Sequence, residues 1–274
     1  MMALSIVVLV IGAGCAPAFR AHPQLQEKVK SIKTVAIIPP SVRVYQLSAD
    51  GDRKLMEDAT ADATQQVARS IGERLKGLPG FVFTPFPSPS ALPKTSSDLT
   101  AAGLKVELED TQALFDMVSA SVIFHTYSRR DALGQPFPEK LKNFDYSLGP
   151  EVQQLAKLAN ADALLFTSGV DHISTGGRKA QMVLLPLALG ILTLPIGGGG
   201  AHLGAMPPGS TTLSVALVDG KSGTLLWYNA VGNAIGHALG RQDIYLLTYP
   251  DHADELVERA FHAFPVRETP TRNE

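Results

Sequence analysis

The sequence predicts an α/β fold: a mixed sheet with helices packed on it, in one domain that follows an N-terminal apolar segment and a tether. Three patterns predict this. A strand, a helix and a strand succeed one another over residues 34–86, a helix runs into a strand near residue 161, and a strand–turn–strand unit covers residues 211–231. The first unit forms a right-handed crossover between parallel strands by default. The hairpin adds antiparallel strands, so the sheet is mixed.

The first unit starts with Thr34–Ile38, a β-rich apolar run that two prolines end, which is typical of a buried strand. Residues 41–54 are interpreted as a polar loop. A helix is expected over Leu55–Leu75 and a short strand over Phe81–Phe86. The apolar residues that recur four apart on one face of the helix are Ala63, Val67, Ile71 and Leu75.

The middle of the chain is less regular. Residues 104–127 predict one or two helices, and residues 128–148, which contain glycine and two prolines, are interpreted as a long loop. The next helix begins near Pro150, since proline is favoured at the first helical position. It leads almost without a loop into an apolar strand over Ala161–Val170.

The C-terminal part predicts a hairpin and a helix. Thr211–Val218 and Thr224–Val231 are the strands, and Asp219–Gly223 is the turn, because Asp-Gly and a later glycine supply the positive φ that such turns need. Asp251–Phe264 is an amphipathic helix. The tail, residues 266–274, is expected to be disordered.

The N-terminal segment carries the clearest signal. Ala3–Gly14 is an apolar run of twelve residues that ends in small residues directly before Cys15, the only cysteine. The run is too short to span a bilayer, which takes about 20 apolar residues, and it has the length of a secretory signal. A sole thiol in this place resembles the lipobox of bacterial lipoproteins, although Gly12 stands where that motif usually has leucine.

This resemblance implies a signal peptide over residues 1–14, a lipid attached to Cys15, and an anchor and tether over residues 15–32. In that family the signal is cut off before the cysteine, which is acylated on its sulfur and on the new amino group. Ala16 follows the cysteine, and a residue other than aspartate there implies an outer-membrane location on the periplasmic side. The alternative is a buried N-terminal strand with an incidental cysteine.

Three further stretches, Thr34–Pro40, Ala159–Phe166 and Leu217–Trp227, carry a second resemblance. Together with the signal, their order is similar to that in the envelope lipoproteins of the curli-secretion CsgG type. That group includes the penicillin-binding-protein activators and the amino-terminal domain of TolB. The resemblance implies an α/β domain over residues 33–265 that binds or scaffolds envelope proteins, or assembles with itself, without catalysis.

An apolar insertion rich in glycine and proline lies at residues 174–209. Its segment Met182–Ile196 carries no charge, but its prolines disfavour a membrane-spanning hairpin. Three interpretations stay open: a helix or loop buried against the sheet, membrane contact beside the lipid anchor, and an oligomer or partner interface. In an alternative function, residues 182–200 contact the membrane as part of an oligomeric pore or export component.

The composition and the remaining motifs argue against other functions. A net charge of −2 gives no basic surface for nucleic acid. The glycines of residues 197–204 lack the ending of a phosphate loop and the spacing of a dinucleotide fingerprint. Asp171 and His172 are neighbours on a strand and so point to opposite faces. We therefore expect no cofactor, no metal and no catalytic residue.

Two groups of residues have a structural interpretation instead. The acidic and histidine residues of the last helix are expected on a solvated face, as a weak pair at most. They are His252, Glu255, Glu258 and His262. Trp227 follows a turn on a strand and is expected to be a core residue.

Overall fold

The computed structural model describes residues 19–87, 101–127, 138–175, 209–232 and 246–267. Its strands are β1 Phe19–Ala21, β2 Thr34–Ile37, β3 Ser41–Leu47, β4 Arg53–Leu55, β5 Val82–Pro85, β6 Ala163–Ser174, β7 Gly209–Asp219 and β8 Leu225–Gly232. Its α-helices are α1 Leu25–Ser31, α2 Glu57–Lys76, α3 Ala101–Val122, α4 Pro138–Lys142, α5 Val152–Leu158 and α8 Pro250–Ala260. A π-helical turn, η2 Ile123–Tyr127, continues α3, and a 3₁₀ turn, η3 Leu246–Thr248, precedes α8.

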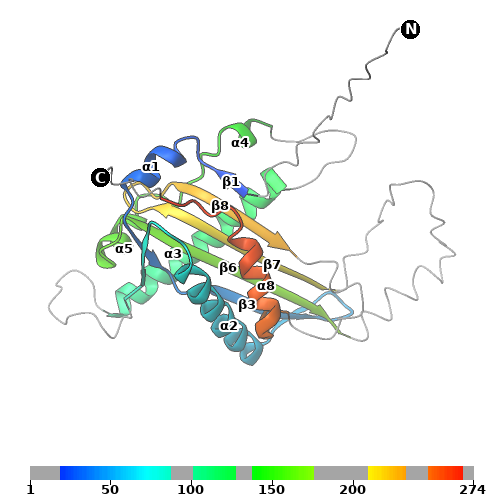
Figure 1. Ribbon diagram of the computed structural model, residues 1–274. Coiled ribbons are helices and arrows are strands. Elements are labelled where there is room, and N and C mark those ends of the chain that lie inside the picture. Colours follow the sequence, from blue (N-terminus) through cyan, green and yellow to red (C-terminus); the bar gives the residue numbers. More distant parts are fainter. Residues whose placement is uncertain (1–18, 88–100, 128–137, 176–208, 233–245, 268–274) are drawn as a thin grey trace, which may run out of the picture.

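The strands form one eight-stranded mixed sheet with helices on both faces (Figure 1). Its path is β1-β8-β7-β6-β2-β5, so β1 and β5 lie at opposite edges. β2 and β3 follow each other along the same side of β6 and both run parallel to it, whereas β7 is antiparallel to β6 and to β8. The predicted fold class, an α/β protein with a mixed sheet, is therefore confirmed.

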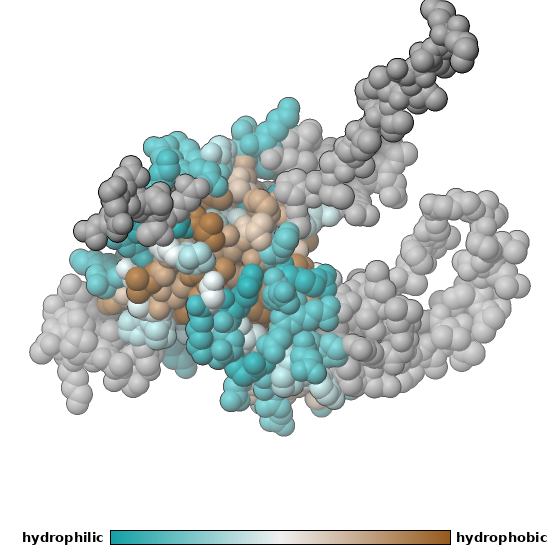
Figure 2. Space-filling model, viewed as in Figure 1, coloured by the Kyte–Doolittle hydropathy of each residue, from teal (hydrophilic) through white to brown (hydrophobic). Residues whose placement is uncertain are grey.

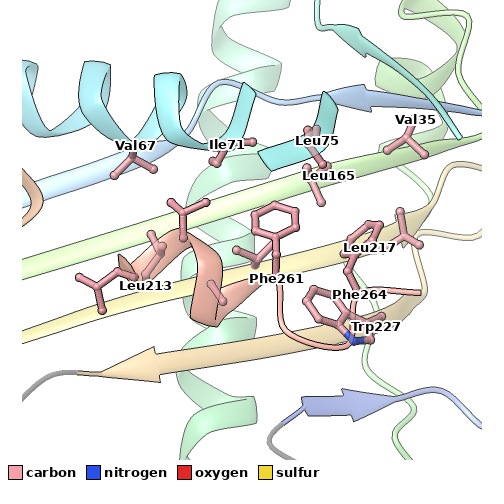
Figure 3. Packing of buried hydrophobic residues seen from close by; sticks show 14 of the residues in the cluster. Val35, Val67, Ile71, Leu75, Leu165, Leu213, Leu217, Trp227, Phe261 and Phe264 are labelled. Carbon is pink, nitrogen blue, oxygen red and sulfur yellow. The ribbon is translucent and has the colours of Figure 1, made fainter. Parts of the chain in front are cut away.

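One face of the sheet is covered by α1, α2 and α8. The four residues of α2 that were expected to share a face are all buried: Ala63, Val67, Ile71 and Leu75. They pack in one cluster with Leu165 and Leu213 of the sheet, and with Phe261 after α8 (Figure 3). Trp227 is fully buried there with its ring 5.0 Å from that of Phe264, so its expected place in the core is confirmed. The outer surfaces of α2 and α8 are hydrophilic (Figure 2).

The other face of the sheet is covered by α3 and α5. Phe115 of α3 packs on Phe166 of β6 with ring centroids 5.3 Å apart. The hydroxyl of Tyr228 is buried beside Ser119 of α3, with 2.7 Å between the two oxygens. The sheet thus separates two apolar clusters, one on each face.

The expected polar loop over residues 41–54 is wrong. Residues 41–47 form β3, which pairs with the second half of β6, and residues 53–55 pair back on it as β4. Val42 and Val44 are buried, while Arg43 between them is exposed. Two prolines end β2, yet the alternation of apolar and polar residues resumes directly after them, and a strand needs only that alternation to bury one face.

The expected tether is too long, because residues 19–32 belong to the folded domain. β1 adds an antiparallel strand to the edge of β8, with Phe19 opposite Asn229. Leu25 and Val29 of α1 are buried. The Nζ of Lys28 lies 2.7 Å from a carboxylate oxygen of Asp219. A short helix needs few apolar residues to dock, and here four-residue spacing supplies them within a polar stretch.

The expected long loop over residues 128–148 is also interrupted by structure. Residues 138–142 form α4, and both Phe144 and Leu148 are buried in the cluster beneath α3. Other expectations fall outside the described residues. They are the signal peptide and Cys15, the insertion over residues 176–208, and the tail from residue 268 onward.

Candidate functional site

The edge strand β1 is the point of the domain to which an anchor on Cys15 would be joined. β1 begins at Phe19, four residues after Cys15. A fully extended chain advances about 3.3–3.6 Å per residue, so the Cα of Cys15 lies within about 14 Å of the Cα of Phe19. A lipid on Cys15 would therefore keep this corner of the domain close to the membrane.

Arg20 of β1 joins this corner to the end of α3. One terminal nitrogen of its guanidinium donates to the carbonyl oxygen of Thr126 in η2, and the other donates to the carbonyl of Phe19 at 3.0 Å. The guanidinium carbon lies 4.4 Å from the centroid of the Tyr127 ring. A cation over an aromatic face is attracted by the ring quadrupole. Arg20 thus holds β1 and η2 together at the corner where the chain enters the domain.

Tyr127 and Asn229 extend this contact to the opposite face of the sheet. The Tyr127 hydroxyl donates to Oδ1 of Asn229 at 3.3 Å and accepts from the backbone N–H of Ala230 at 3.3 Å. Nδ2 of Asn229 donates to the carbonyls of Arg259 and Ala260, at 3.2 and 2.9 Å. These carbonyls belong to the last turn of α8, where carbonyls lack partners within the helix; that of Arg259 also accepts from the N–H of His262 at 3.2 Å.

The protonation state of the Tyr127 phenol fixes the direction of the hydrogen bond to Asn229. Burial raises the pKa of Tyr127 to about 12, and the Arg20 guanidinium opposes that rise. The phenol is therefore protonated at neutral pH and donates to Asn229. The resulting corner network, Arg20–Tyr127–Asn229, ties β1, η2, β8 and α8 together.

A hollow of about 510 Å³ adjoins the corner network. It is lined by Tyr127, Asn229, Ala230, Val231, Gly232, Glu258, Arg259 and His262. Arg259 donates to the carbonyl of Gly232 at 3.2 Å, and its other terminal nitrogen lies 3.8 Å from a carboxylate oxygen of Glu255. In the parts of the chain that the structure describes, no group of three or more His, Cys, Asp or Glu side chains is arranged to hold a metal ion.

The outer surface of α3 differs from that of the other long helices because it is largely apolar. Val106 is 56% exposed, Met117 is 64% exposed, and Phe124 in η2 is 52% exposed. The exposed charged side chains of the helix lie near its start, at Lys105, Glu109 and Asp110. We call the stretch from Ala113 to Phe124 the outer face of α3.

A second hollow, of about 590 Å³, lies along the start of α3. It is lined by Gly103, Val106, Glu107, Asp110, Thr111, Leu114 and Glu151. Its wall is mainly apolar, with three carboxylates at its margin, and burial raises the pKa of Glu107. Such a hollow suits an apolar side chain that is flanked by a positive charge.

The isolated polar residues that were considered for chemistry have structural contacts. Asp171 is buried and accepts from the Thr211 hydroxyl at 2.7 Å and from the backbone N–H of Leu247 at 3.2 Å. His172 instead stacks on Tyr45, with ring centroids 5.5 Å apart. Both residues also contact β7, His172 through Ser210, but Asp171 reaches η3 and His172 reaches β3, as expected for adjacent residues that point to opposite faces.

The corner network was not predicted from the sequence. Tyr127 and Asn229 are 102 positions apart, and nothing in the local pattern of either residue indicates the other. One signal was present: Asn229 is the sole amide side chain in the apolar strand β8. A buried amide usually finds hydrogen-bond partners, so its position could have indicated a polar network.

Comparisons with known proteins give little. No family model matches the chain, and no curated protein matches it. Among solved structures, the crystal structure of lipoprotein GNA1162 from Neisseria meningitidis is similar over 73% of this chain and 81% of that chain, with 13% identity and a TM-score of 0.23. A likeness at that level carries no argument, so the function is argued from the chain itself. None of the helices within the described ranges is long and apolar enough to cross a membrane.

Proposed function

We propose that the protein is a lipid-anchored envelope protein, acylated on Cys15, whose α/β domain binds other envelope proteins or further copies of itself. It faces the periplasm from the outer membrane and performs no catalysis. One observation carries the proposal: Cys15 stands between an apolar run that ends directly before it and a folded domain that begins four residues after it.

The physical chemistry of acylation supports this role for Cys15. Each methylene group of a buried acyl chain contributes about 0.8 kcal/mol, and one chain alone anchors a protein only marginally. Two chains on the sulfur-linked glycerol and a third on the amino group would make the attachment effectively permanent. The domain then needs no membrane-spanning segment of its own.

Binding of a protein partner is supported by the start of α3. Apolar surface exposed around Val106 is of the kind that marks interaction sites. The neighbouring carboxylates of Glu107, Asp110 and Glu151 line the hollow there. Together they favour a partner segment that presents an apolar side chain next to lysine or arginine. The resemblance to the CsgG-type lipoproteins favours the same class of role.

A pore or export component is the second candidate, and the uncharged apolar segment Met182–Ile196 favours it. Ile173 lies opposite Gly209, so the chain between these strands leaves and returns at adjacent positions, as in any antiparallel pair. In this alternative, residues 182–200 contact the membrane within an oligomer. Deleting residues 182–200 would then abolish detergent-resistant oligomers and membrane permeability.

Fractionation of the native chain beside a Cys15→Ser variant tests the main proposal. We expect the native chain in the outer-membrane fraction and the variant in the soluble periplasmic fraction. A variant that stays in the membrane fraction would contradict anchoring through Cys15 alone and would favour the pore candidate. A native chain that is itself soluble would overturn both.

A further inference from the structure

We infer that the outer face of α3, from Ala113 to Phe124, rests on the surface of the phospholipid bilayer that holds the anchor. This inference rests on the proposed function, because it takes the acylation of Cys15 as given. It adds the orientation of the domain, and it identifies which of its surfaces meets the lipid.

The exposed residues of this face carry no charge. They are Ala113, Met117, Ala120, Ser121 and Phe124. Four of them are spaced 4, 3 and 4 positions apart, which places them in one stripe along the helix. The one charged side chain in the stretch, Asp116, turns away from the stripe and pairs with Arg43 of β3 at 3.2 Å. An uncharged stripe of this kind suits the boundary between headgroups and acyl chains.

The end of this face lies close to the point where the anchor joins the domain. Arg20 is five residues from Cys15 and contacts both Thr126 and Tyr127, the second and third residues beyond the stripe. The chain from Phe19 to Cys15 reaches at most about 14 Å. From Ala113 to Phe124, at about 1.5 Å per residue, the stripe is about 17 Å long. The bilayer that holds Cys15 must therefore lie close to the end of the stripe.

Two surfaces adjoin β1. Towards α8, exposed side chains are charged or polar, with Glu255, Glu258 and Arg259 among them, and the outer surface of α8 is hydrophilic (Figure 2). Towards η2, the exposed side chains are those of the uncharged stripe and, beyond His125 and Tyr146, the charged residues of α4 and of the segment after it, Glu139, Lys142 and Asp145. Burying charged groups in an apolar environment is costly, so the uncharged stripe is the surface at this corner that a membrane meets.

The stripe contacts lipid only when Cys15 is anchored in the same bilayer. Met117 and Phe124 are its two large apolar side chains, too few to hold a domain on a membrane from solution. A short linker raises the effective concentration of a second contact to about the millimolar range. Weak interfacial contacts then become occupied. The inference therefore requires lipid contact in the acylated protein and no vesicle binding by the Cys15→Ser variant.

Fluorescence quenching tests the inference. The acylated Met117→Trp and Val82→Trp proteins are reconstituted in phosphatidylcholine vesicles whose acyl chains are brominated near the headgroup. Val82 is a matched control, because it is 61% exposed and lies on β5, at the edge of the sheet opposite β1. Trp227 is buried and gives both variants the same background.

We expect brominated lipid to remove most of the added fluorescence of Met117→Trp and to leave that of Val82→Trp unchanged. Acylated, vesicle-bound Met117→Trp that is not quenched would overturn the inference and leave the proposed function standing. Equal quenching of both variants would also overturn it. If the mass of the same sample shows that Cys15 carries no lipid, the proposed function and the inference fail together.

Sedimentation of the Cys15→Ser chain distinguishes a second copy as the occupant of the stripe. We expect a monomer, both for this chain and for the same chain with Met117→Glu. A dimer that Met117→Glu dissociates would show that the stripe binds another copy instead of lipid, and would overturn the inference.

Discussion

The two longest helices of the described chain, α2 and α3, lie on opposite faces of the sheet and differ in the side chains that they expose to solvent. α2 buries one apolar face and exposes mainly charged side chains, as a helix at the surface of a soluble domain does. α3 buries Leu104, Phe115 and Val122 against the sheet and still exposes apolar side chains outward. A helix that is apolar on both sides can make a second contact, which in the proposed orientation is with the membrane that holds Cys15.

The largest expected effect comes from the buried face of α2. Ile71 is 1% exposed, so Ile71→Ala leaves a cavity and should lower the free energy of unfolding by about 2–5 kcal/mol. Met117→Ala on the outer face of α3 should change it by less than about 0.5 kcal/mol. Urea unfolding of the Cys15→Ser chain measures both. A similar cost at the two sites would mean that the outer face of α3 is packed inside the domain, against the comparison.

The next effect concerns the place where the two faces are joined. Asn229→Ala removes the side chain that bonds Tyr127 and the last carbonyls of α8. The Tyr127 hydroxyl then keeps only the donor from Ala230, and the carbonyl of Ala260 loses the Asn229 donor. We expect a loss of about 1–3 kcal/mol in the free energy of unfolding. Tyr127→Phe should lose part of this, and the double variant should cost less than the sum of the two. Strict additivity in denaturant unfolding would show that the network is not one unit.

A smaller effect is expected at β1. Arg20→Gln removes the cation over the Tyr127 ring and the charged donor to Thr126, at a cost of about 1 kcal/mol. Hydrogen exchange should show faster opening of β1 and η2 while the amides of α2 keep their protection. Uniform loss of protection throughout the domain would place Arg20 in the global core, contrary to its role at one corner.

The smallest effect is expected at the end of β7, beside its turn to β8. Burial alone would raise the pKa of Asp219, but the Lys28 ammonium and the N–H groups of Lys221 and Ser222 outweigh it and hold that pKa below its ordinary value. The stabilisation is therefore present above the ordinary carboxyl pKa and is lost as pH falls through the lowered one. Lys28→Met should lower stability at neutral pH by about 0.5 kcal/mol and reduce this acid dependence. Unfolding curves collected between neutral and strongly acidic pH would reveal an unchanged dependence if the pair contributes nothing.

Local patterns predicted much of the fold, and distant contacts limited the rest. The four-residue spacing in α2 and the glycines of the β7–β8 turn gave their elements correctly, since each signal lies within one element. β3 was not predicted, because Pro39 and Pro40 precede it and a chain that ends one strand rarely resumes pairing beside the same neighbour. β1 and α1 were missed since each gains its place only by docking on β8 and the core.

Of the candidate site, too, only the parts with a local pattern could be predicted from the sequence. Cys15 was predicted from the sequence alone, because its signal is the run of residues directly before it, and the prediction stays one. The corner network could not be, because Arg20, Tyr127 and Asn229 come from segments that the sheet brings together. The outer face of α3 had a local signal, apolar residues on more than one side of a helix. The structure was needed to show which of these residues pack on the sheet and which face outward.

The most direct test of the account is the intact mass of the mature protein and of its N-terminal peptide. The account predicts a chain cut directly before Cys15, with the mass of a diacylglyceryl group on the sulfur and of a further acyl group on the amino terminus. The Cys15→Ser variant should lack both additions. A native chain that keeps residues 1–14 and carries no lipid would contradict the anchor, and with it the orientation of the domain on the membrane.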